Sequence, residues 1–177
     1  RRIPRFALMR ALQTAEILAV GSELLTSFRQ DTNSLFLAGR LNESGVDVRW
    51  KTVVGDDRSD LAAALRQARA RAHVVIATGG LGPTADDLTR EVAAEVLGLA
   101  LEEDPEIATR IEQRFAKRGL RMPEVNRRQA MVPRGATVLA NPNGTAPGLL
   151  IETPDRVVVL LPGPPRELLP MIDGLAA

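Results

Sequence analysis

Short apolar runs alternate along this chain with segments in which apolar residues recur every three or four positions. The runs over residues 15–20 and 72–77 end at glycine or at polar turns, as buried strands do, and residues 46–54 alternate apolar and polar positions, which predicts another strand. The periodic segments predict amphipathic helices, and they cover residues 33–43, 59–70 and 88–97. Strands and helices that alternate in this way predict an α/β fold in which a parallel sheet is covered by helices on both faces.

The second half of the chain breaks this alternation. Residues 105–129 predict helices that are interrupted at Gly119 and Pro123. Three short strands joined by turns are then expected over residues 137–140, 149–152 and 157–161. They predict mixed or antiparallel strands at one side of the sheet, and a last helix is expected over 166–175.

Length and composition predict one globular domain, because 177 residues with 45% hydrophobic and 25% charged positions can form a proper core. The basic residues are scattered and aromatic residues make up only 3%, so nucleic-acid binding has no support. No stretch reaches the roughly 18 apolar residues of a membrane span. The absence of cysteine suits a reducing compartment. We therefore expect a cytoplasmic protein with an N-terminal extension over 1–13, too short in apolar residues for an export signal, and a domain over 14–177.

The segment from Thr78 to Arg90, TGGLGPTADDLTR, carries the most informative chemistry. It connects the third predicted strand to the helix that follows. Gly79, Gly80 and Gly82 allow backbone N–H groups to come close to a ligand, and the N-terminus of a helix attracts anions. This order of strand, glycine loop and helix predicts a phosphate site.

Two carboxylates, Asp86 and Asp87, are expected in the first turn of that helix. They would repel a phosphate unless a cation lay between them, and Mg²⁺ is commonly held by one or two carboxylates plus phosphate oxygens. Glu23, just after the first strand, is either a third metal ligand or an acid at a helix start. A structural alternative exists, because Thr84 and Asp87 have the spacing of a capping box. Capping does not explain three glycines and a proline, so we favour a metal-assisted site for a phosphate or pyrophosphate ligand.

Four loops are expected at the carboxyl edge of the sheet, where open α/β sheets bind ligands. They are rich in glycine, proline or small polar residues and cover 21–25, 78–87, 141–148 and 162–165. The only histidine, His73, begins a strand at the opposite end and is expected to be structural. Without cysteine, tyrosine or a usable histidine, the remaining groups are carboxylates, hydroxyls, backbone amides and a metal. Such groups suit phosphoryl or nucleotidyl chemistry.

An ordered set of further motifs accompanies the glycine loop. It consists of 21–25 (GSELL), 31–34 (DTNS), 54–57 (VGDD), 126–129 with Pro133, 141–148 (NPNGTAPG) and 161–167 (LPGPPRE). Together these motifs resemble the molybdopterin-binding fold of MogA and MoeA, and their order is similar to that of the amino-terminal domain of CinA-like proteins. The resemblance covers about residues 14–174. One departure is Thr26-Ser27, where a Leu-Gly pair is common in the family.

The resemblance implies a three-layer α/β/α sandwich with a mostly parallel sheet, assembled as a homo-oligomer, either a dimer or a trimer. In CinA-like proteins it also implies a divalent-metal-dependent pyrophosphatase that converts ADP-ribose to AMP and ribose 5-phosphate. Many such proteins continue into a nicotinamide-mononucleotide deamidase domain, an activity that we do not assign to this chain. Two alternatives remain open: a molybdopterin-binding or adenylylating protein of molybdenum cofactor biosynthesis, and a noncatalytic nucleotide-binding module.

On this reading Asp87 and Asp86, with Glu23 assisting, are the catalytic and metal-holding residues. The residues expected to bind phosphate or the rest of the substrate are Thr78, Gly79, Gly80, Leu81, Gly82, Thr84, Ser22, Asn33, Asn141, Thr145, Gly163 and Pro164. The expected cofactor is a divalent metal such as Mg²⁺, and the expected partner is a phosphate-containing nucleotide.

Overall fold

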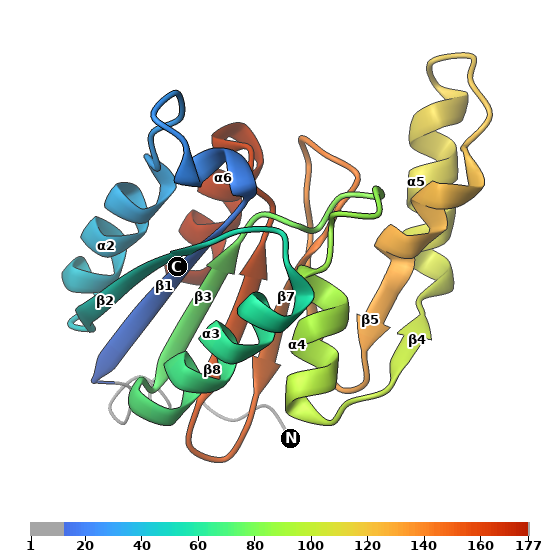
Figure 1. Ribbon diagram of the computed structural model, residues 1–177. Coiled ribbons are helices and arrows are strands. Elements are labelled where there is room, and N and C mark those ends of the chain that lie inside the picture. The colour runs from blue at the N-terminus through green and yellow to red at the C-terminus, as the bar shows by residue number, and fades with distance from the viewer. Residues whose placement is uncertain (1–12, 177) are drawn as a thin grey trace.

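A six-stranded sheet runs through the centre of the computed structural model, which describes residues 13–176 (Figure 1). Its strand order is β2-β1-β3-β8-β7-β6. The first four strands in this order are parallel, and they are β2 (Asp47–Val54), β1 (Thr14–Val20), β3 (Val74–Thr78) and β8 (Val157–Leu161). The last two, β7 (Gly148–Glu152) and β6 (Thr137–Leu139), are antiparallel to their neighbours. The mostly parallel sheet with antiparallel strands at one side is therefore confirmed.

Helices cover both faces of this sheet, which gives the predicted three layers (Figure 1). The α-helices are α2 (Asn33–Glu43), α3 (Arg58–Arg71), α4 (Thr89–Leu97), α5 (Pro105–Ala116) and α6 (Pro165–Ala176), and two 3₁₀ helices are η1 (Ser22–Leu25) and η2 (Glu124–Ala130). No helix in the described part of the chain is long and apolar enough to cross a membrane. The predicted extension over 1–13 lies, except for Gln13, outside the described residues.

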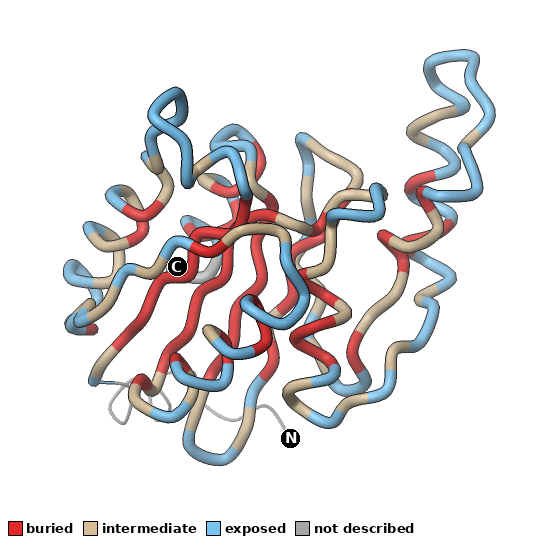
Figure 2. The backbone as a smooth tube through the Cα atoms, viewed as in Figure 1, coloured by how far each residue is buried: buried red, intermediate tan, exposed pale blue. Residues whose placement is uncertain are grey.

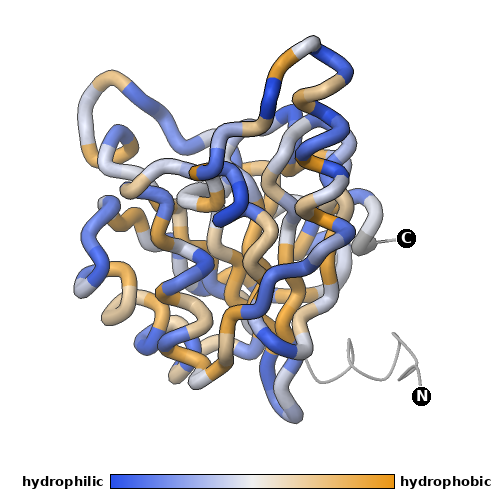
Figure 3. Tube along the Cα trace, turned by 90° about the vertical axis from the view of Figure 1, so that its right-hand side faces the viewer, coloured by the Kyte–Doolittle hydropathy of each residue, from blue (hydrophilic) through white to orange (hydrophobic). Residues whose placement is uncertain are grey.

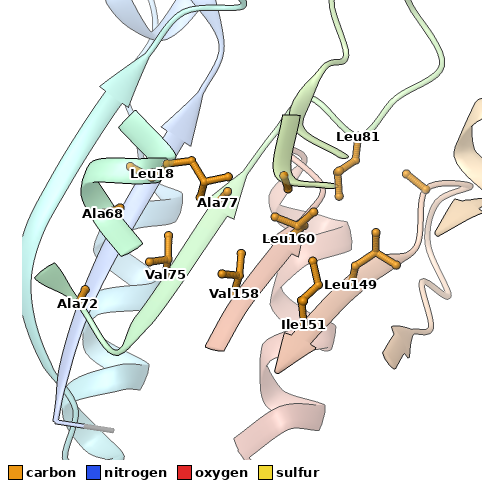
Figure 4. Close-up of a cluster of buried hydrophobic side chains, with 13 residues drawn as sticks. Leu18, Ala68, Ala72, Val75, Ala77, Leu81, Leu149, Ile151, Val158 and Leu160 are labelled. Atoms are coloured by element: carbon orange, nitrogen blue, oxygen red, sulfur yellow. The ribbon is translucent and has the colours of Figure 1, made fainter. Parts of the chain in front are cut away.

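The two faces of β3 show why its residues form a central strand. Val75 and Ala77 pack towards α3 and α4, in the cluster that Figure 4 shows. Val74 and Ile76 pack on the other face, with Leu37 of α2 and residues of α6. Because successive strand residues point to opposite faces, a strand buried on both sides is mainly apolar. Figure 2 shows the resulting band of buried strands, and Figure 3 shows hydrophobic positions gathered along the sheet while the outer turns are mainly hydrophilic.

A second, small sheet was not expected from the sequence. Strands β4 (Leu101–Glu103) and β5 (Met131–Pro133) pair antiparallel. Together with α5 and η2 between them they form an arm, residues 101–133, that extends away from the main sheet (Figure 1). Each of these strands has only three residues, and Glu102 and Glu103 are exposed, so neither shows an apolar run. A separate apolar cluster around Ile107 and Ile111 of α5 stabilises the arm.

Candidate functional site

A cavity of about 750 Å³ opens where β1, β3 and β8 end. All four predicted loops contribute to its wall, as does the segment that leads into α2. The predicted site residues that line it are Glu23, Asn33, Thr78, Gly79, Gly80, Leu81, Gly82, Asp86, Asp87, Thr145, Gly163 and Pro164. The structure thus brings together residues that are far apart in sequence, at the edge of the sheet where ligands of such folds bind.

Three predicted site residues do not line the cavity and instead hold residues that do. The Ser22 backbone N–H donates to the Asp56 carboxylate at 2.8 Å, and the Ser22 hydroxyl accepts from the Asp56 backbone N–H at 3.0 Å. Thr84 binds the carboxylate of Asp87. The Asn141 side-chain amide donates to the Ala146 carbonyl at 2.8 Å and to Glu167 at 2.7 Å. Each of the three therefore supports a residue of the cavity wall, and its contact with a ligand stays a prediction.

The sequence-based prediction missed several polar residues of the cavity wall. They are Arg29, Gln30, Asp31, Thr32, Asp56, Gln129 and Glu167. Most of them belong to motifs that carried the family resemblance, but only contacts between distant segments show that they share one wall. One such contact is the hydrogen bond at 2.7 Å from the Asn33 side-chain amide to the Gly163 carbonyl.

The charge of the cavity wall is strongly negative. Six carboxylates line it, namely Glu23, Asp31, Asp56, Asp86, Asp87 and Glu167, against the single guanidinium of Arg29. A phosphate-bearing ligand cannot enter such an environment favourably unless a cation accompanies it, because like charges at close range repel.

The glycine loop turns three consecutive carbonyl groups towards the start of α4. The Thr89 hydroxyl donates to the Gly79 carbonyl at 2.8 Å, and the Thr89 backbone N–H donates to the Gly80 carbonyl at 3.1 Å. The guanidinium of the fully buried Arg90 donates to the Leu81 carbonyl at 2.9 Å. These three carbonyls are therefore fixed by Thr89 and Arg90 at the beginning of the helix.

The same three contacts determine the direction of the N–H groups. In a planar trans peptide the N–H points opposite to the carbonyl, so the N–H groups of Gly80, Leu81 and Gly82 point away from α4. The cavity lies along these residues, and none of their N–H groups donates to another residue of the described range 13–176. Successive free N–H groups of this kind form an anion-binding concavity. The Gly79 N–H is different, because it donates to the Leu161 carbonyl at 2.9 Å.

Arg90 and Arg128 support this loop from beneath. Burial lowers the pKa of the Arg90 guanidinium, although the nearby carboxylates of Glu91 and Asp87 favour its charged form. Arg128 donates to the Thr84 and Asp87 carbonyls and, at 3.0 Å, to the carboxylate of Glu91. The two guanidinium groups therefore fix backbone carbonyls of the loop on the side away from the cavity.

The two aspartates lie before α4 and not in its first turn, so that prediction is wrong. The helix begins at Thr89, and the Asp87 backbone N–H donates to the Thr84 carbonyl at 3.2 Å. The Asp87 carboxylate accepts from the Thr84 N–H at 2.9 Å and from the Thr84 hydroxyl at 2.6 Å. A capping-type contact is thus present, but it closes a turn that precedes the helix. The helix starts late because the N–H and hydroxyl of Thr89 bind the glycine loop.

The predicted metal ligands do not form a ready cluster of three. Within residues 13–176 no group of three or more acidic or histidine side chains is arranged to hold a metal ion. Glu23 lies back over Gly21, where its carboxylate is 2.6 Å from the position that a Cβ would take. Asp86 and Asp87 still provide adjacent oxygen donors on the cavity wall. This donor set fits Mg²⁺ that shares its coordination with phosphate oxygens, and it does not form a cage made by the protein alone.

His73 lies at the other end of β3, as expected. Its Nδ1 is 2.9 Å from the Thr14 hydroxyl. Its backbone N–H donates to Thr14 of β1, and its carbonyl accepts from Val157 of β8. The histidine therefore has a structural contact remote from the cavity.

The mostly parallel sheet, with a glycine loop and an acidic cavity at its carboxyl edge, defines an α/β domain of the class that binds ligands at that edge. The chain belongs to the family described as Probable molybdopterin binding domain, whose model matches residues 16–177.

Within this family the chain is similar to CinA-like proteins. It is 55% identical over 158 residues to a CinA-like protein of Koribacter versatilis, covering 87% of this chain and 38% of that protein. It is 52% identical over 159 residues to one of Solibacter usitatus, covering 90% and 38%. The chain thus spans well under half the length of these curated relatives.

Solved structures agree with this assignment. The crystal structure of CinA from Thermoplasma acidophilum has a TM-score of 0.86 at 32% identity, with coverage of 93% of this chain and 96% of that one. A structure of MogA has a TM-score of 0.61 at 22% identity, with 93% of both chains covered, and shows the shared fold.

Proposed function

We propose that this domain is a metal-dependent pyrophosphatase that hydrolyses ADP-ribose to AMP and ribose 5-phosphate. The observation that carries the proposal is the proximity of three free backbone N–H groups, those of Gly80, Leu81 and Gly82, to the carboxylates of Asp86 and Asp87 on one cavity wall. The N–H groups suit phosphate oxygens, and the carboxylates suit the cation that such a ligand requires here. A volume of about 750 Å³ is in the usual range for a ligand of nucleotide size.

Each part of the wall has a role in this reaction. The N–H groups of the glycine loop bind and orient the pyrophosphate, and they stabilise negative charge that develops on it. Asp86 and Asp87, with Glu23 assisting, would hold Mg²⁺, which when bound neutralises phosphate charge and makes water more acidic. Water attacks one phosphorus, and the bond from that phosphorus to the bridging oxygen breaks. The bridging oxygen leaves with the electron pair on the other phosphate, and a cavity carboxylate, for which Glu23 is the candidate, accepts the proton of the water.

The test is AMP release from ADP-ribose with Mg²⁺, Mn²⁺ or Co²⁺. Asp87→Asn keeps an oxygen that accepts the hydrogen bonds from Thr84 but removes the charge. We expect it to reduce turnover about 100-fold or more. Asp155→Asn is the matched control, because Asp155 lies in the exposed turn before β8, at the opposite end of that strand from the cavity. A folded parent that releases no AMP with any of the three metals would refute the hydrolase proposal.

The family description supports a second candidate, a protein that binds or adenylylates molybdopterin with the same loop. That activity would require a pterin and, for adenylylation, ATP, whereas the pyrophosphatase requires neither. A parent that binds pterin and consumes ATP only in its presence would favour this candidate. Nucleotide binding without turnover in either assay would favour a noncatalytic module.

We also propose that the domain forms a homo-oligomer. Large apolar side chains are exposed in the segment over 25–35, which also contains residues of the cavity wall, with Phe28 95%, Leu25 62% and Leu35 59% accessible. Large apolar side chains exposed within one short segment favour association. Light scattering should give the mass of a dimer or trimer, and Phe28→Ser should lower it. A parent that stays monomeric at high concentration would contradict this proposal.

A further inference from the structure

A second cavity, of about 430 Å³, lies between α5 and the loop over 141–147. Its floor is apolar and includes Ile107 and Ile111. Four cations line it, namely Arg110, Arg114, Lys117 and Arg118, and no carboxylate does. We call this cavity the basic groove. Its charge is opposite to that of the cavity with six carboxylates described above.

The four cations share one side of the arm, because residues three or four positions apart on a helix are neighbours. None of them forms an ion pair within the described range, whereas the nearby Arg127 pairs with Glu103 at 2.6 Å and Glu124 at 3.7 Å. Like charges at this spacing repel one another. An anion bound among them would relieve the repulsion. Glu167, a carboxylate behind the groove wall, accepts from Asn141 and forms no ion pair with any of the four cations.

The opposite wall of the groove contributes neutral polar groups and a fixed backbone. Asn141, Gly144 and Thr145 lie there. Arg114 donates to the Pro142 carbonyl at 3.1 Å and so ties this wall to α5. Thr145 lines the acidic cavity as well, which makes the two cavities neighbours.

We propose that the basic groove is a second anion site, which binds a phosphate group without any metal. Guanidinium and ammonium groups supply charge-assisted hydrogen bonds to phosphate oxygens. The acidic cavity needs a cation to accept the same group, so a chelator separates the two sites. The phosphate belongs either to a ligand whose other end lies in the acidic cavity or to a separate phosphorylated molecule.

The test is a titration of the protein with inorganic pyrophosphate in EDTA, followed through the amide signals of a ¹⁵N-labelled sample. We expect signals of α5 and of the loop over 141–147 to shift. Arg110→Gln combined with Lys117→Gln should weaken binding about tenfold, since it removes two charge-assisted contacts from exposed positions. The control is Arg49→Gln with Lys51→Gln. It removes two charges from β2, the edge strand at the end of the sheet opposite β6.

The proposal fails if pyrophosphate in EDTA leaves the α5 signals unchanged. It also fails if the control pair weakens binding as much as the groove pair, because net charge alone would then explain the effect. Neither result depends on turnover, so failure here is separate from failure of the pyrophosphatase proposal.

A second titration identifies the source of the phosphate. It compares the binding of ADP-ribose with that of an ADP-ribose that carries a third phosphate. Both are titrated in Mg²⁺ into the Asp87→Asn variant, which limits hydrolysis during the measurement. If the second ligand binds more tightly, and this advantage disappears when Arg110→Gln and Lys117→Gln are added, the groove binds a phosphate of the same ligand that occupies the acidic cavity. Equal binding of the two ligands assigns the groove to a separate phosphorylated molecule.

Discussion

Replacing Thr89 by valine tests whether the glycine loop is held for binding by the start of α4. Valine has nearly the same shape as threonine but lacks the hydroxyl that donates to the Gly79 carbonyl at 2.8 Å. Thr89 is 2% exposed and Gly79 is buried, so water cannot replace the lost donor. The Gly79 carbonyl is then free to turn, and with it the N–H of Gly80.

The magnitude follows from the environment of this bond. A buried carbonyl left without a partner costs about 1–3 kcal/mol. In a chain of 177 residues, each kcal/mol lowers Tm by roughly 2–4 °C. A backbone N–H bound to a charged oxygen contributes about 1.5–3 kcal/mol. Because Thr89 and Arg90 still fix the next two carbonyls, we expect partial loss, about tenfold in the affinity for pyrophosphate with Mg²⁺.

The assay separates this effect from a simple loss of stability. Tm, the affinity for pyrophosphate with Mg²⁺ and kcat/KM for ADP-ribose are measured for Thr89→Val and Thr89→Ser. Serine keeps the hydroxyl and loses the methyl group, so we expect a lower Tm but nearly parental binding. If the valine and serine variants bind equally well, the orientation argument is wrong and Thr89 only stabilises the fold.

Two further predictions concern glycine positions and pH. Gly79→Ala should destabilise the domain by about 3 kcal/mol or more, because φ is 96° and a Cβ would collide with the Val20 carbonyl. Gly39→Ala should instead stabilise α2 by about 0.5–1 kcal/mol, because nothing lies within 4 Å of the added Cβ. Equal Tm values of the two variants in thermal melts would contradict both expectations. Hydrogen bonds lower the pKa of Asp57 below its ordinary value of 3.8. The Ser59 hydroxyl has the largest effect, and the backbone N–H groups of Asp60 and Ser59 come next. The stability that this carboxylate contributes is therefore present above pH 3.8 and is lost as pH falls through the lower folded pKa. Denaturation at several pH values should show the parent losing its advantage over Asp57→Asn in that acidic range, and a difference independent of pH would count against the assignment.

The central strands and helices were predictable because burial imposes a pattern on their sequence. Strands such as β3, buried on both faces, are mainly apolar runs. Helix α2 was expected over the same residues that form it. The arm was less predictable. Strands β4 and β5 are held by pairing across about thirty residues and not by local apolar periodicity.

The candidate site was predictable in outline but not in its supporting contacts. Glycines and carboxylates after a strand are visible in sequence. Arg90 is not, because an arginine near a helix start suggests a solvated side chain, and only the fold shows it fully buried beneath the Leu81 carbonyl. The late start of α4 was missed for a related reason. The Thr89 hydroxyl and N–H bind the carbonyls of Gly79 and Gly80, so this N–H does not extend the helix towards earlier residues.

The position of β8 in the sheet has a consequence for how the chain folds. Strands β1, β2 and β3 come first in the chain, whereas β8 follows only after α4, the arm and β7, so it is the last of the four parallel strands to become available during synthesis. Until then one edge of the mainly apolar β3 has no partner, and unpaired edges of this kind promote aggregation. The long-range pairing that completes the sheet also brings Gly163 to Asn33. Closure of the ligand cavity and protection of the nascent chain therefore occur in the same late step.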